Sequence, residues 1–358
     1  MNPNANDQLT ISRRPRAAIL QDPLHFQPPA TCPDMPHRVI VSTGARLHFG
    51  LLAHAPLAGR QFGGVGLMVD HPGFQLEVEV APHGEPADHY SGSEVWRQRV
   101  LDVVQRCREL APTTPESCLW TLEKSILPHV GLGSGTQLSL AVARAYSALS
   151  DKSALTATEL AHLAGRGLRS ALGIHGFEQG GLLVEAGKLS TEQVSPAVSR
   201  VDWPDDWRLL LVRPTNAIGL CGSSEIQAFA NLLPMPDAVS ARLCQITLLE
   251  LLPAVLEADY ETCAEALFQF GRLVGDYFAP AQGGTYSTPR IRDLVQHLRE
   301  QGIRGVGQSS WGPTAFVMCP NRSMADELRG DLLQTGWGDC EILCVAARNE
   351  GAKMECLL

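Results

Sequence analysis

A glycine-rich turn that opens a helix of small residues is the feature that most constrains this fold. The segment HVGLGSGTQ at 129–137 leads into SLAVARAYSAL, a run of alanine, leucine and small polar residues. Glycine lets the backbone approach a ligand closely. The N-terminus of a helix has free N–H groups and the positive end of a dipole, and it binds phosphate readily. The segment therefore predicts a phosphate cradle, against the alternative of a tight turn before a buried helix.

The turn is not a Walker A loop, because the Gly-Lys-Ser/Thr ending is absent. Ser134 and Thr136 carry hydroxyls that can cap the helix or donate to a ligand. The residues that we expect to bind phosphate are Gly131, Gly133, Ser134, Gly135, Thr136 and Gln137.

A second stretch, STGARLHFG at 42–50, has the residue pattern of a strand. On a strand, Arg46 and His48 point to the same face. Arginine binds a carboxylate or phosphate with two parallel hydrogen bonds, and histidine donates a hydrogen bond or transfers a proton. The pair predicts an anion site, with a solvent-facing polar edge as the alternative.

Two further glycine-rich stretches carry polar residues. Glu178 lies in GIHGFEQGG, where its carboxylate is suited to hold magnesium or act as a base, unless it is a solvated loop residue. The segment GVGQSSWGPT at 305–314 lies between an expected helix and strand. Its Ser309, Ser310 and Gly312 are expected to line a substrate site, with a hairpin turn around a packed tryptophan as the alternative.

The apolar periodicity predicts an α+β fold with antiparallel strands. We expect strands within 38–52, 74–81, 117–126, 180–187 and 207–214, and helices within 92–110, 130–149 and 154–167. The pattern predicts mostly helix from 222 to 280. For 289–347 it predicts the order helix, strand, strand, helix, strand. The domain boundaries follow as a flexible Pro-rich tail at 1–36, a lobe with the phosphate loop at 37–200, and a second lobe at 201–358.

Composition narrows the class of protein. The chain of 358 residues has 29 basic and 38 acidic residues, net −9, which argues against a broad nucleic-acid-binding surface. We expect no segment apolar and long enough to span a membrane, and the N-terminus lacks the apolar core of a secretory signal, so we predict a cytoplasmic protein. Ten cysteines without a C-x-x-C pair predict reduced thiols, with Cys340 and Cys344 on one strand face.

Taken in order, the glycine-rich stretches resemble the motifs of the GHMP kinase superfamily. GLGSGTQ at 131–137 resembles its second motif, and GQSSWGPTAF at 307–316 resembles its last. Within the superfamily, GARLHFGLL, GLGSGTQ and GFEQGG most resemble the β-ribofuranosylaminobenzene 5′-phosphate synthases of tetrahydromethanopterin biosynthesis, a branch of one-carbon metabolism. The resemblance covers roughly residues 38–350.

The resemblance implies a two-lobed fold, with an N-terminal lobe like the second domain of ribosomal protein S5 and a ferredoxin-like C-terminal lobe. It implies that phosphoribosyl pyrophosphate joins 4-hydroxybenzoate or 4-aminobenzoate, releasing carbon dioxide and pyrophosphate and leaving a C-riboside. Mg²⁺ and a homodimer are expected. Arg46 would bind the benzoate carboxylate or the 5′-phosphate, His48 would bind the para substituent or move its proton, and Glu178 would hold magnesium or act as a base.

Two departures from the family pattern leave other activities open. GSGT replaces the GSSA of related kinases at 133–136, which argues against ordinary ATP phosphotransfer. Family members often carry an acid where Ala53 and its neighbours stand here, so Asp70 or Glu178 would have to substitute for it. The alternatives are an ATP-dependent GHMP small-molecule kinase and a binding or regulatory protein without turnover.

Overall fold

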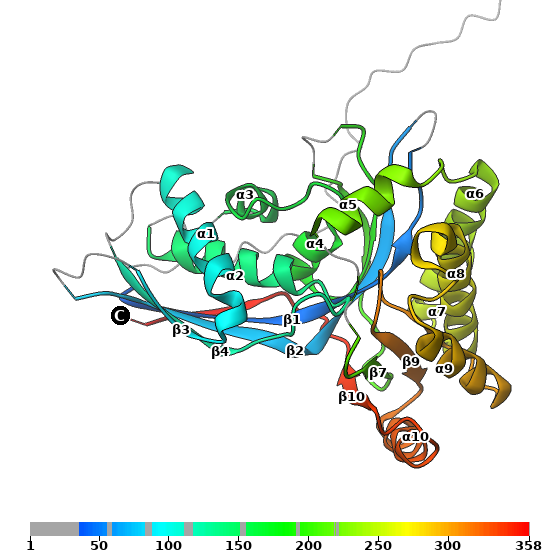
Figure 1. Cartoon of the computed structure of the whole chain (residues 1–358). Coiled ribbons are helices and arrows are strands. Elements are labelled where there is room, and N and C mark those ends of the chain that lie inside the picture. The colour runs from blue at the N-terminus through cyan, green and yellow to red at the C-terminus, as the bar shows by residue number, and fades with distance from the viewer. Residues whose placement is uncertain are drawn as a thin grey trace, which may run out of the picture.

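The computed structural model contains two sheets with their helices (Figure 1), and two clusters of buried apolar residues form the core. It describes residues 36–55, 59–82, 88–110, 117–150, 155–190, 194–217, 219 and 222–357, the side chains of 222–226 excepted. The predicted tail lies outside the described residues, apart from residue 36.

The larger sheet contains the strands of the first lobe. Its seven strands in the described residues are β1 (Arg38–Leu51), β2 (Gly64–Val80), β3 (His89–Gly92), β4 (Cys118–Lys124), β5 (Leu182–Glu185), β6 (Ala197–Val201) and β11 (Lys353–Leu357). β1 lies between β11 and β2, and β2 also pairs with β4 and β5. The β1–β2 register shifts between Thr43 and Ala45 and again between His48 and Gly50. Such bulges re-aim side chains, and these two flank the predicted Arg46–His48 pair.

Helices cover one face of this sheet (Figure 1). They are α1 (Glu94–Leu110), α2 (Ser134–Ala148), α3 (Ala157–Leu163) and α4 (Leu172–Gln179). The expected capping box at the start of α3 is confirmed, because Thr156 and Glu159 bond to each other's backbone N–H. α2 is buried on nearly all sides, as its small residues require.

The smaller sheet has the ferredoxin-like topology. Its described strands are β7 (Arg208–Pro214), β8 (Val306–Gln308), β9 (Ala315–Cys319) and β10 (Cys340–Ala346), in the order β10-β7-β9-β8 and all antiparallel. The helices between and beside them are α5 (Gly222–Asn231), α6 (Asp237–Gln245), the π-helix η1 (Ile246–Leu251), α7 (Leu252–Leu256), α8 (Tyr260–Gln282), α9 (Pro289–Glu300) and α10 (Arg322–Gln334). This confirms the helix, strand, strand, helix, strand order expected for 289–347.

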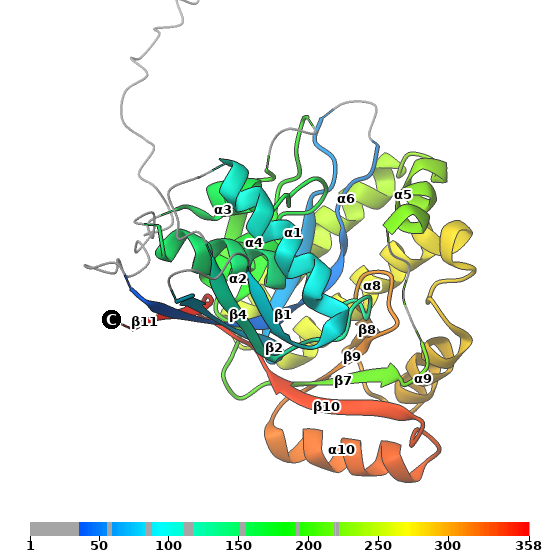
Figure 2. The same ribbon diagram turned by 60° about the vertical axis from the view of Figure 1, so that its left-hand side comes forward.

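Alternating residues of β7 bury its two faces against different partners. Leu209 and Leu211 belong to the main core, together with apolar residues of α8. Leu210 and Val212 belong to a second core with apolar residues of α9 and α10. The alternation follows from the two-residue period of a strand, and Figure 2 shows α10 against β10 and β7.

The last strand returns to the first lobe. β11 pairs antiparallel with β1, from Arg38 opposite Leu357 to Ser42 opposite Lys353. The expected lobe at 201–358 therefore ends before β11, whose pairing adds an edge strand to the larger sheet. A five-residue strand at a chain end carries little periodicity, so the sequence did not reveal it.

The expectation that no segment is long and apolar enough to span a membrane is wrong for one helical stretch. Among the described residues, Asp237–Leu256 is long and apolar enough to cross a membrane by length and composition. The stretch comprises α6, η1 and α7, and it packs against α8 through buried residues such as Leu243 and Ile246. Arg242 and Glu250 pair at 2.6 Å within it. Helices in protein cores also meet this criterion of length and apolar composition, so the criterion alone is weak evidence for a membrane span.

The cysteines are free thiols at seven described positions, which agrees with the prediction for those residues. Cys340 and Cys344 are both buried on β10, on the shared face that the strand period predicts. Cys356 on β11 is disulfide-bonded, which corrects the expectation that every cysteine is reduced.

Candidate active site

The N-terminus of α2 is a glycine-rich turn without a side-chain cap. Gly131 and Gly133 have φ of +82° and +67°, left-handed conformations that favour glycine. Gly133 is the N-cap, and there is no side-chain cap hydrogen bond. The expected capping by Ser134 or Thr136 is therefore wrong. The first N–H groups of an α-helix lack the usual partner four residues earlier, so this terminus offers donors to an anion, although the N–H of Thr136 already donates to the carbonyl oxygen of Gly133 at 3.1 Å.

Two guanidinium groups flank this terminus. A methyl group placed on Gly133 would lie 3.3 Å from Nε of Arg46, so the Arg46 head group lies directly beside the turn. On the other side, Nη2 of Arg166 donates to the carbonyl oxygen of Gly135 at 3.0 Å. Arg46 comes from β1 and Arg166 from the connection between α3 and α4. The sequence identified Arg46 but missed Arg166, which stands in an AGRG loop with no motif to mark it.

The last glycine-rich segment packs directly onto the turn. Oγ of Ser309 donates to the carbonyl oxygen of Gly131 at 2.7 Å and accepts from the N–H of His48 at 3.0 Å. The N–H of Ser310 donates to the carbonyl oxygen of His48 at 2.8 Å. Three stretches far apart in sequence, around residues 46, 131 and 309, therefore form one site, as their predicted roles require.

Several predicted ligand residues instead support this arrangement. Ser309 is fully buried and its hydroxyl is committed to the two loops. Gln137 is also fully buried; it accepts from the Thr43 hydroxyl at 3.1 Å and donates to the carbonyl oxygen of Gly173 at 2.8 Å. Gly312 is buried against the turn, whereas Ser310 is exposed. Of the three residues expected in the substrate wall, Ser310 is the one whose side chain is accessible.

His48 is a neutral imidazole in this site. Its side chain is buried, and burial together with the neighbouring Arg46 charge holds its pKa well below the ordinary value. A neutral ring offers one donor and one acceptor nitrogen. His48 is therefore suited to hydrogen bonding or to accepting a proton, and it adds no positive charge.

A buried carboxylate and a buried amine lie near the site and were not predicted. Glu185 is fully buried and accepts from the N–H of Ala171 at 2.7 Å. Burial raises its pKa to about 6, against the lowering effects of Ser170, Ala171, Ser195 and the Arg46 charge. Lys188 is also fully buried, and its amine donates to the carbonyl oxygen of Gly167 at 2.9 Å. The signal for Glu185 was a single acid ending the apolar run LLVE.

Glu178 is not at the phosphate turn. It lies on helix α4, not in a loop, and pairs with Arg144 at 3.0 Å, with both side chains less than a tenth exposed. Arg144 is ten residues beyond Ser134 on α2, which places it about 15 Å along the helix from the turn. Burial raises the pKa of Glu178, and Arg144 opposes the rise. The interpretation of Glu178 as a solvated loop acid is wrong, and the pair gives it a structural role.

No described residues gather into a metal site. Groups of three or more His, Cys, Asp or Glu side chains suited to a metal ion are absent from the described part of the chain. Asp70, the other acid considered, accepts from the N–H of Ala346 at 3.0 Å and pairs with His71 at 2.8 Å. The described side chains therefore do not form a magnesium cage of their own.

An aromatic cluster adjoins the last glycine-rich segment. The ring centroid of Trp311 lies 5.3 Å from that of Phe229 and 4.7 Å from that of Phe278. The guanidinium of Arg169 lies over the Phe229 ring at 5.0 Å. Trp311 follows directly after Ser310 in the chain, so an apolar wall with a nearby cation borders the site.

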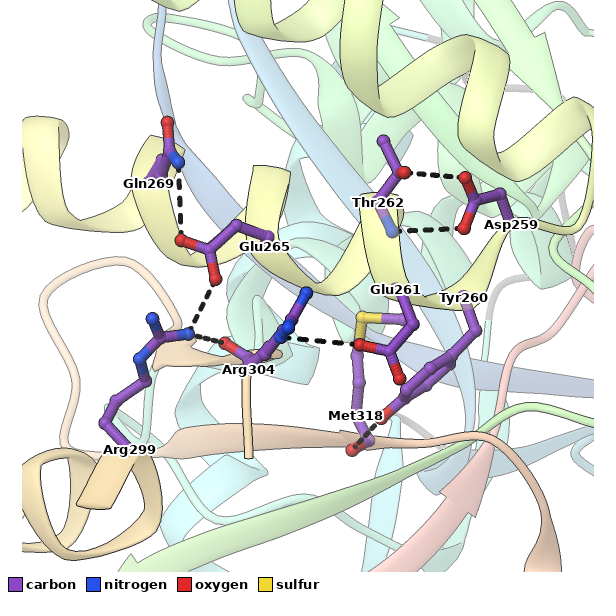
Figure 3. Close-up of polar contacts among 9 residues, drawn as sticks. All are labelled: Asp259, Tyr260, Glu261, Thr262, Glu265, Gln269, Arg299, Arg304 and Met318. Carbon is purple, nitrogen blue, oxygen red and sulfur yellow. Dashed lines mark hydrogen bonds and ion pairs between the residues drawn. The ribbon is translucent and has the colours of Figure 1, made fainter. Parts of the chain in front are cut away.

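A second cleft, with a volume of about 330 Å³, lies in the C-terminal lobe, and Figure 3 shows polar side chains along its wall. It is lined in part by Tyr260, Glu261 and Arg304. The Tyr260 hydroxyl donates to the carbonyl oxygen of Met318 at 2.8 Å, and Arg304 pairs with Glu261 at 3.5 Å. These groups bind one another, and none of the predicted site residues lines this cleft. The candidate active site is therefore the one around α2.

The fold and site define a class. The family profile of the GHMP kinases N terminal domain matches residues 98–180, and that of the GHMP kinases C terminal matches residues 251–340. Homoserine kinase from Cytophaga hutchinsonii covers 93% of this chain with a TM-score of 0.60 at 15% identity, and all of that chain is covered. Mevalonate diphosphate decarboxylase from Enterococcus faecalis covers 89% with a TM-score of 0.61 at 16% identity, with 99% of that chain covered. The protein has the two-lobed GHMP fold.

Curated relatives narrow the class to one family. Beta-ribofuranosylphenol 5′-phosphate synthase of Methanothermobacter thermautotrophicus is 30% identical over 335 residues, 88% of this chain and 98% of the relative. The proteins of the same name from Archaeoglobus fulgidus and Methanocaldococcus jannaschii are 29% and 27% identical, over 87% and 88% of this chain and 98% and 100% of their own. The chain belongs to the β-ribofuranosylphenol 5′-phosphate synthase family.

Proposed function

We propose that this protein joins phosphoribosyl pyrophosphate to 4-hydroxybenzoate, releasing carbon dioxide and pyrophosphate and leaving a C-riboside phosphate, as a step of tetrahydromethanopterin biosynthesis. The observation that carries the proposal is the uncapped α2 terminus between Arg46 and Arg166. The names of the relatives specify a phenol product, which favours 4-hydroxybenzoate over 4-aminobenzoate. A cytoplasmic homodimer stays a prediction.

The first task of the site is to stabilise the leaving pyrophosphate. The bond between ribose C1 and the pyrophosphate oxygen breaks, and its electron pair leaves with the pyrophosphate. The N–H groups at the start of α2 and the two arginines beside them would stabilise this negative charge. Preorganised donors of this kind are often the largest contribution to a rate enhancement.

The second task is to align the aromatic ring with ribose C1. The ring carbon that bears the carboxylate forms the new bond to C1, and the electron pair of the breaking carboxylate bond returns to the ring as carbon dioxide leaves. This step needs close alignment and no protein nucleophile. Trp311 and Phe229 provide an apolar wall, and Arg169 is a cation for the carboxylate. Neutral His48 would accept a hydrogen bond from the phenol, because its lowered pKa keeps an acceptor nitrogen on the ring.

Magnesium remains an expectation for the substrate complex. Proteins commonly bind Mg²⁺ through one or two carboxylates together with substrate phosphates. The described residues do not gather a carboxylate set at the turn, and Glu178 is paired with Arg144. The steps proposed above therefore rest on the chain's own donors and charges.

The kinase alternative has less support at this site. A kinase of this fold would use the same turn for ATP phosphates and an acid as base. Glu178, which was expected to hold magnesium or act as a base, is bound to Arg144 away from the turn. Homoserine kinase from Cytophaga hutchinsonii is 15% identical to this chain, a level that shows the fold alone.

The test is the stoichiometry of product release. Purified protein is incubated with phosphoribosyl pyrophosphate, Mg²⁺ and carboxyl-labelled 4-hydroxybenzoate, and carbon dioxide and pyrophosphate are measured. The proposal predicts equal amounts of both, lost in Arg46→Ala and retained in Arg292→Ala, an exposed arginine on α9. If the protein consumes ATP in the presence of a small alcohol and releases no carbon dioxide, the kinase alternative is correct. No turnover of either kind would favour a binding protein.

A further inference from the structure

A basic pocket of about 860 Å³ opens beside the phosphate turn. Arg60, Arg106 and Arg166 line it together with His162, and no carboxylate is among the described residues that form its wall. The whole chain has a net charge of −9, so this local positive charge runs against the overall balance. A concave site lined by one sign of charge attracts small ions of the opposite sign.

The arginines of this pocket are held in place and still have free donors. Nη1 of Arg60 donates to the carbonyl oxygen of Gly187 at 3.0 Å, and Nε of Arg106 donates to that of His162 at 3.4 Å. A guanidinium has five N–H donors. Arg60 and Arg106 therefore each use one hydrogen bond for positioning and retain other donors for an anion.

Arg166 connects this pocket to the phosphate turn. Its side chain lines the pocket, and its Nη2 lies 3.0 Å from the carbonyl oxygen of Gly135 and 3.1 Å from Oγ of Ser139, both in the first turns of α2. One guanidinium thus belongs to both anion sites. A ligand with two anionic ends joined by a short polar body could occupy both.

We propose that the basic pocket binds the 5′-phosphate end of phosphoribosyl pyrophosphate, while the α2 turn binds the pyrophosphate end. This inference rests on the proposed function. The ligand chemistry is a phosphomonoester on a sugar, and the pocket volume accommodates the sugar as well as the phosphate. Arg60 and Arg106 bind the 5′-phosphate, and Arg166 lies between the two ends.

The experiment measures ligand affinity by calorimetry, separately from turnover. Ribose 5-phosphate, pyrophosphate and inorganic phosphate are titrated into the wild type, Arg60→Ala, Arg106→Ala and Arg106→Lys. The control is Arg97→Ala, on the same helix as Arg106 but paired with Glu94 outside the pocket. Loss of a charge-assisted hydrogen bond costs about 1.5–3 kcal/mol, or about 10- to 100-fold in affinity.

The proposal predicts that each alanine variant binds ribose 5-phosphate at least about 10-fold more weakly and raises KM for phosphoribosyl pyrophosphate with a smaller change in kcat. Arg106→Lys should restore part of the affinity. Pyrophosphate affinity should be unchanged, which also shows that the variants are folded. Ribose 5-phosphate affinity that is unchanged in the alanine variants would overturn the pocket assignment. So would inorganic phosphate binding as tightly as ribose 5-phosphate, together with an unchanged KM for phosphoribosyl pyrophosphate in the variants.

The two proposals fail in different ways. If the wild type releases no carbon dioxide from 4-hydroxybenzoate, the proposed reaction is wrong, whatever the pocket binds. If the wild type is active but ribose 5-phosphate affinity does not depend on Arg60 and Arg106, the reaction stands and the pocket assignment is wrong.

Discussion

Replacement of Gly131 by alanine tests whether the phosphate turn and the last glycine-rich segment form one site. Gly131 has φ +82°, and a methyl group there would lie 2.7 Å from the carbonyl oxygen of Ser309 and 2.9 Å from that of Gly312. Both neighbours are backbone atoms, so neither can move aside as a flexible side chain does. The two segments must separate to admit the methyl group.

The magnitude comes from two contributions. Left-handed backbone costs a non-glycine residue about 1–2 kcal/mol. Insertion of a methyl group into a packed site costs about 1–3 kcal/mol more. We therefore expect Gly131→Ala to lower the free energy of unfolding by about 2–5 kcal/mol. Gly283 is a matched control, because its φ is also +82° and a methyl group there would meet nothing within 4 Å.

The assay is urea denaturation of both variants, with pyrophosphate affinity measured alongside. Gly283→Ala should lose only the backbone contribution of about 1–2 kcal/mol and keep its affinity. Gly131→Ala should lose more stability and bind pyrophosphate more weakly, because the turn is displaced. Equal stability losses in the two variants, with unchanged affinity, would refute the packing of the two segments.

Four further predictions concern buried groups. Glu185 has a pKa of about 6 in the folded protein. Between about pH 4.5 and 6 the carboxyl is therefore protonated in the folded state and ionised in the unfolded state. The free energy of unfolding falls by about 2 kcal/mol as the pH rises through this window. Urea denaturation of Glu185→Gln should lack this fall, and an unchanged pH profile would contradict the assignment. The pKa shift of His48 has the opposite effect on the pH dependence of stability. Because this pKa is lowered, the free energy of unfolding falls as the pH drops below about 6.5, by up to about 1.4 kcal/mol per pH unit. His48→Gln should flatten that limb, and an equal slope in both proteins would count against a buried neutral ring. Glu178→Gln removes the carboxylate charge that pairs with the buried Arg144 and should cost about 3–5 kcal/mol in urea denaturation, with magnesium dependence of turnover unchanged. If Glu178→Gln has normal stability but its turnover no longer depends on magnesium, Glu178 is a magnesium ligand after all. Ser309→Ala removes two hydrogen bonds between the loops and should cost about 1–3 kcal/mol, and a neutral result by thermal denaturation would oppose a linking role.

The sequence predicted the elements well because each carries its own period. Strand alternation located β1, β4 and β7, and the ferredoxin-like order of the C-terminal sheet followed from the succession of helices and strands. Arg46 and His48 were predicted correctly as neighbours on β1, because the two-residue period fixes their common side. Turn residues rich in glycine marked the segments that meet at α2.

Residue roles were harder to predict because they depend on contacts between distant segments. Glu178 looked available beside its glycines, yet it meets Arg144, 34 residues earlier in the chain. Gln137 looked like a phosphate ligand, yet its amide joins β1 to α4. Arg166 and Glu185 stand in no recognisable motif, and only the folded chain brings them toward Arg46. Local spacing carries no information about such tertiary partners.

Ligand-dependent melting of the wild type and Arg46→Ala tests the central claim most directly. A ligand that binds only the folded state raises the melting temperature, and at a given concentration the rise is larger for tighter binding. We expect phosphoribosyl pyrophosphate to raise the melting temperature of the wild type, ATP to have little effect, and Arg46→Ala to lose the response. Stabilisation by ATP equal to that by phosphoribosyl pyrophosphate, or an undiminished response in Arg46→Ala, would contradict the assignment of this site.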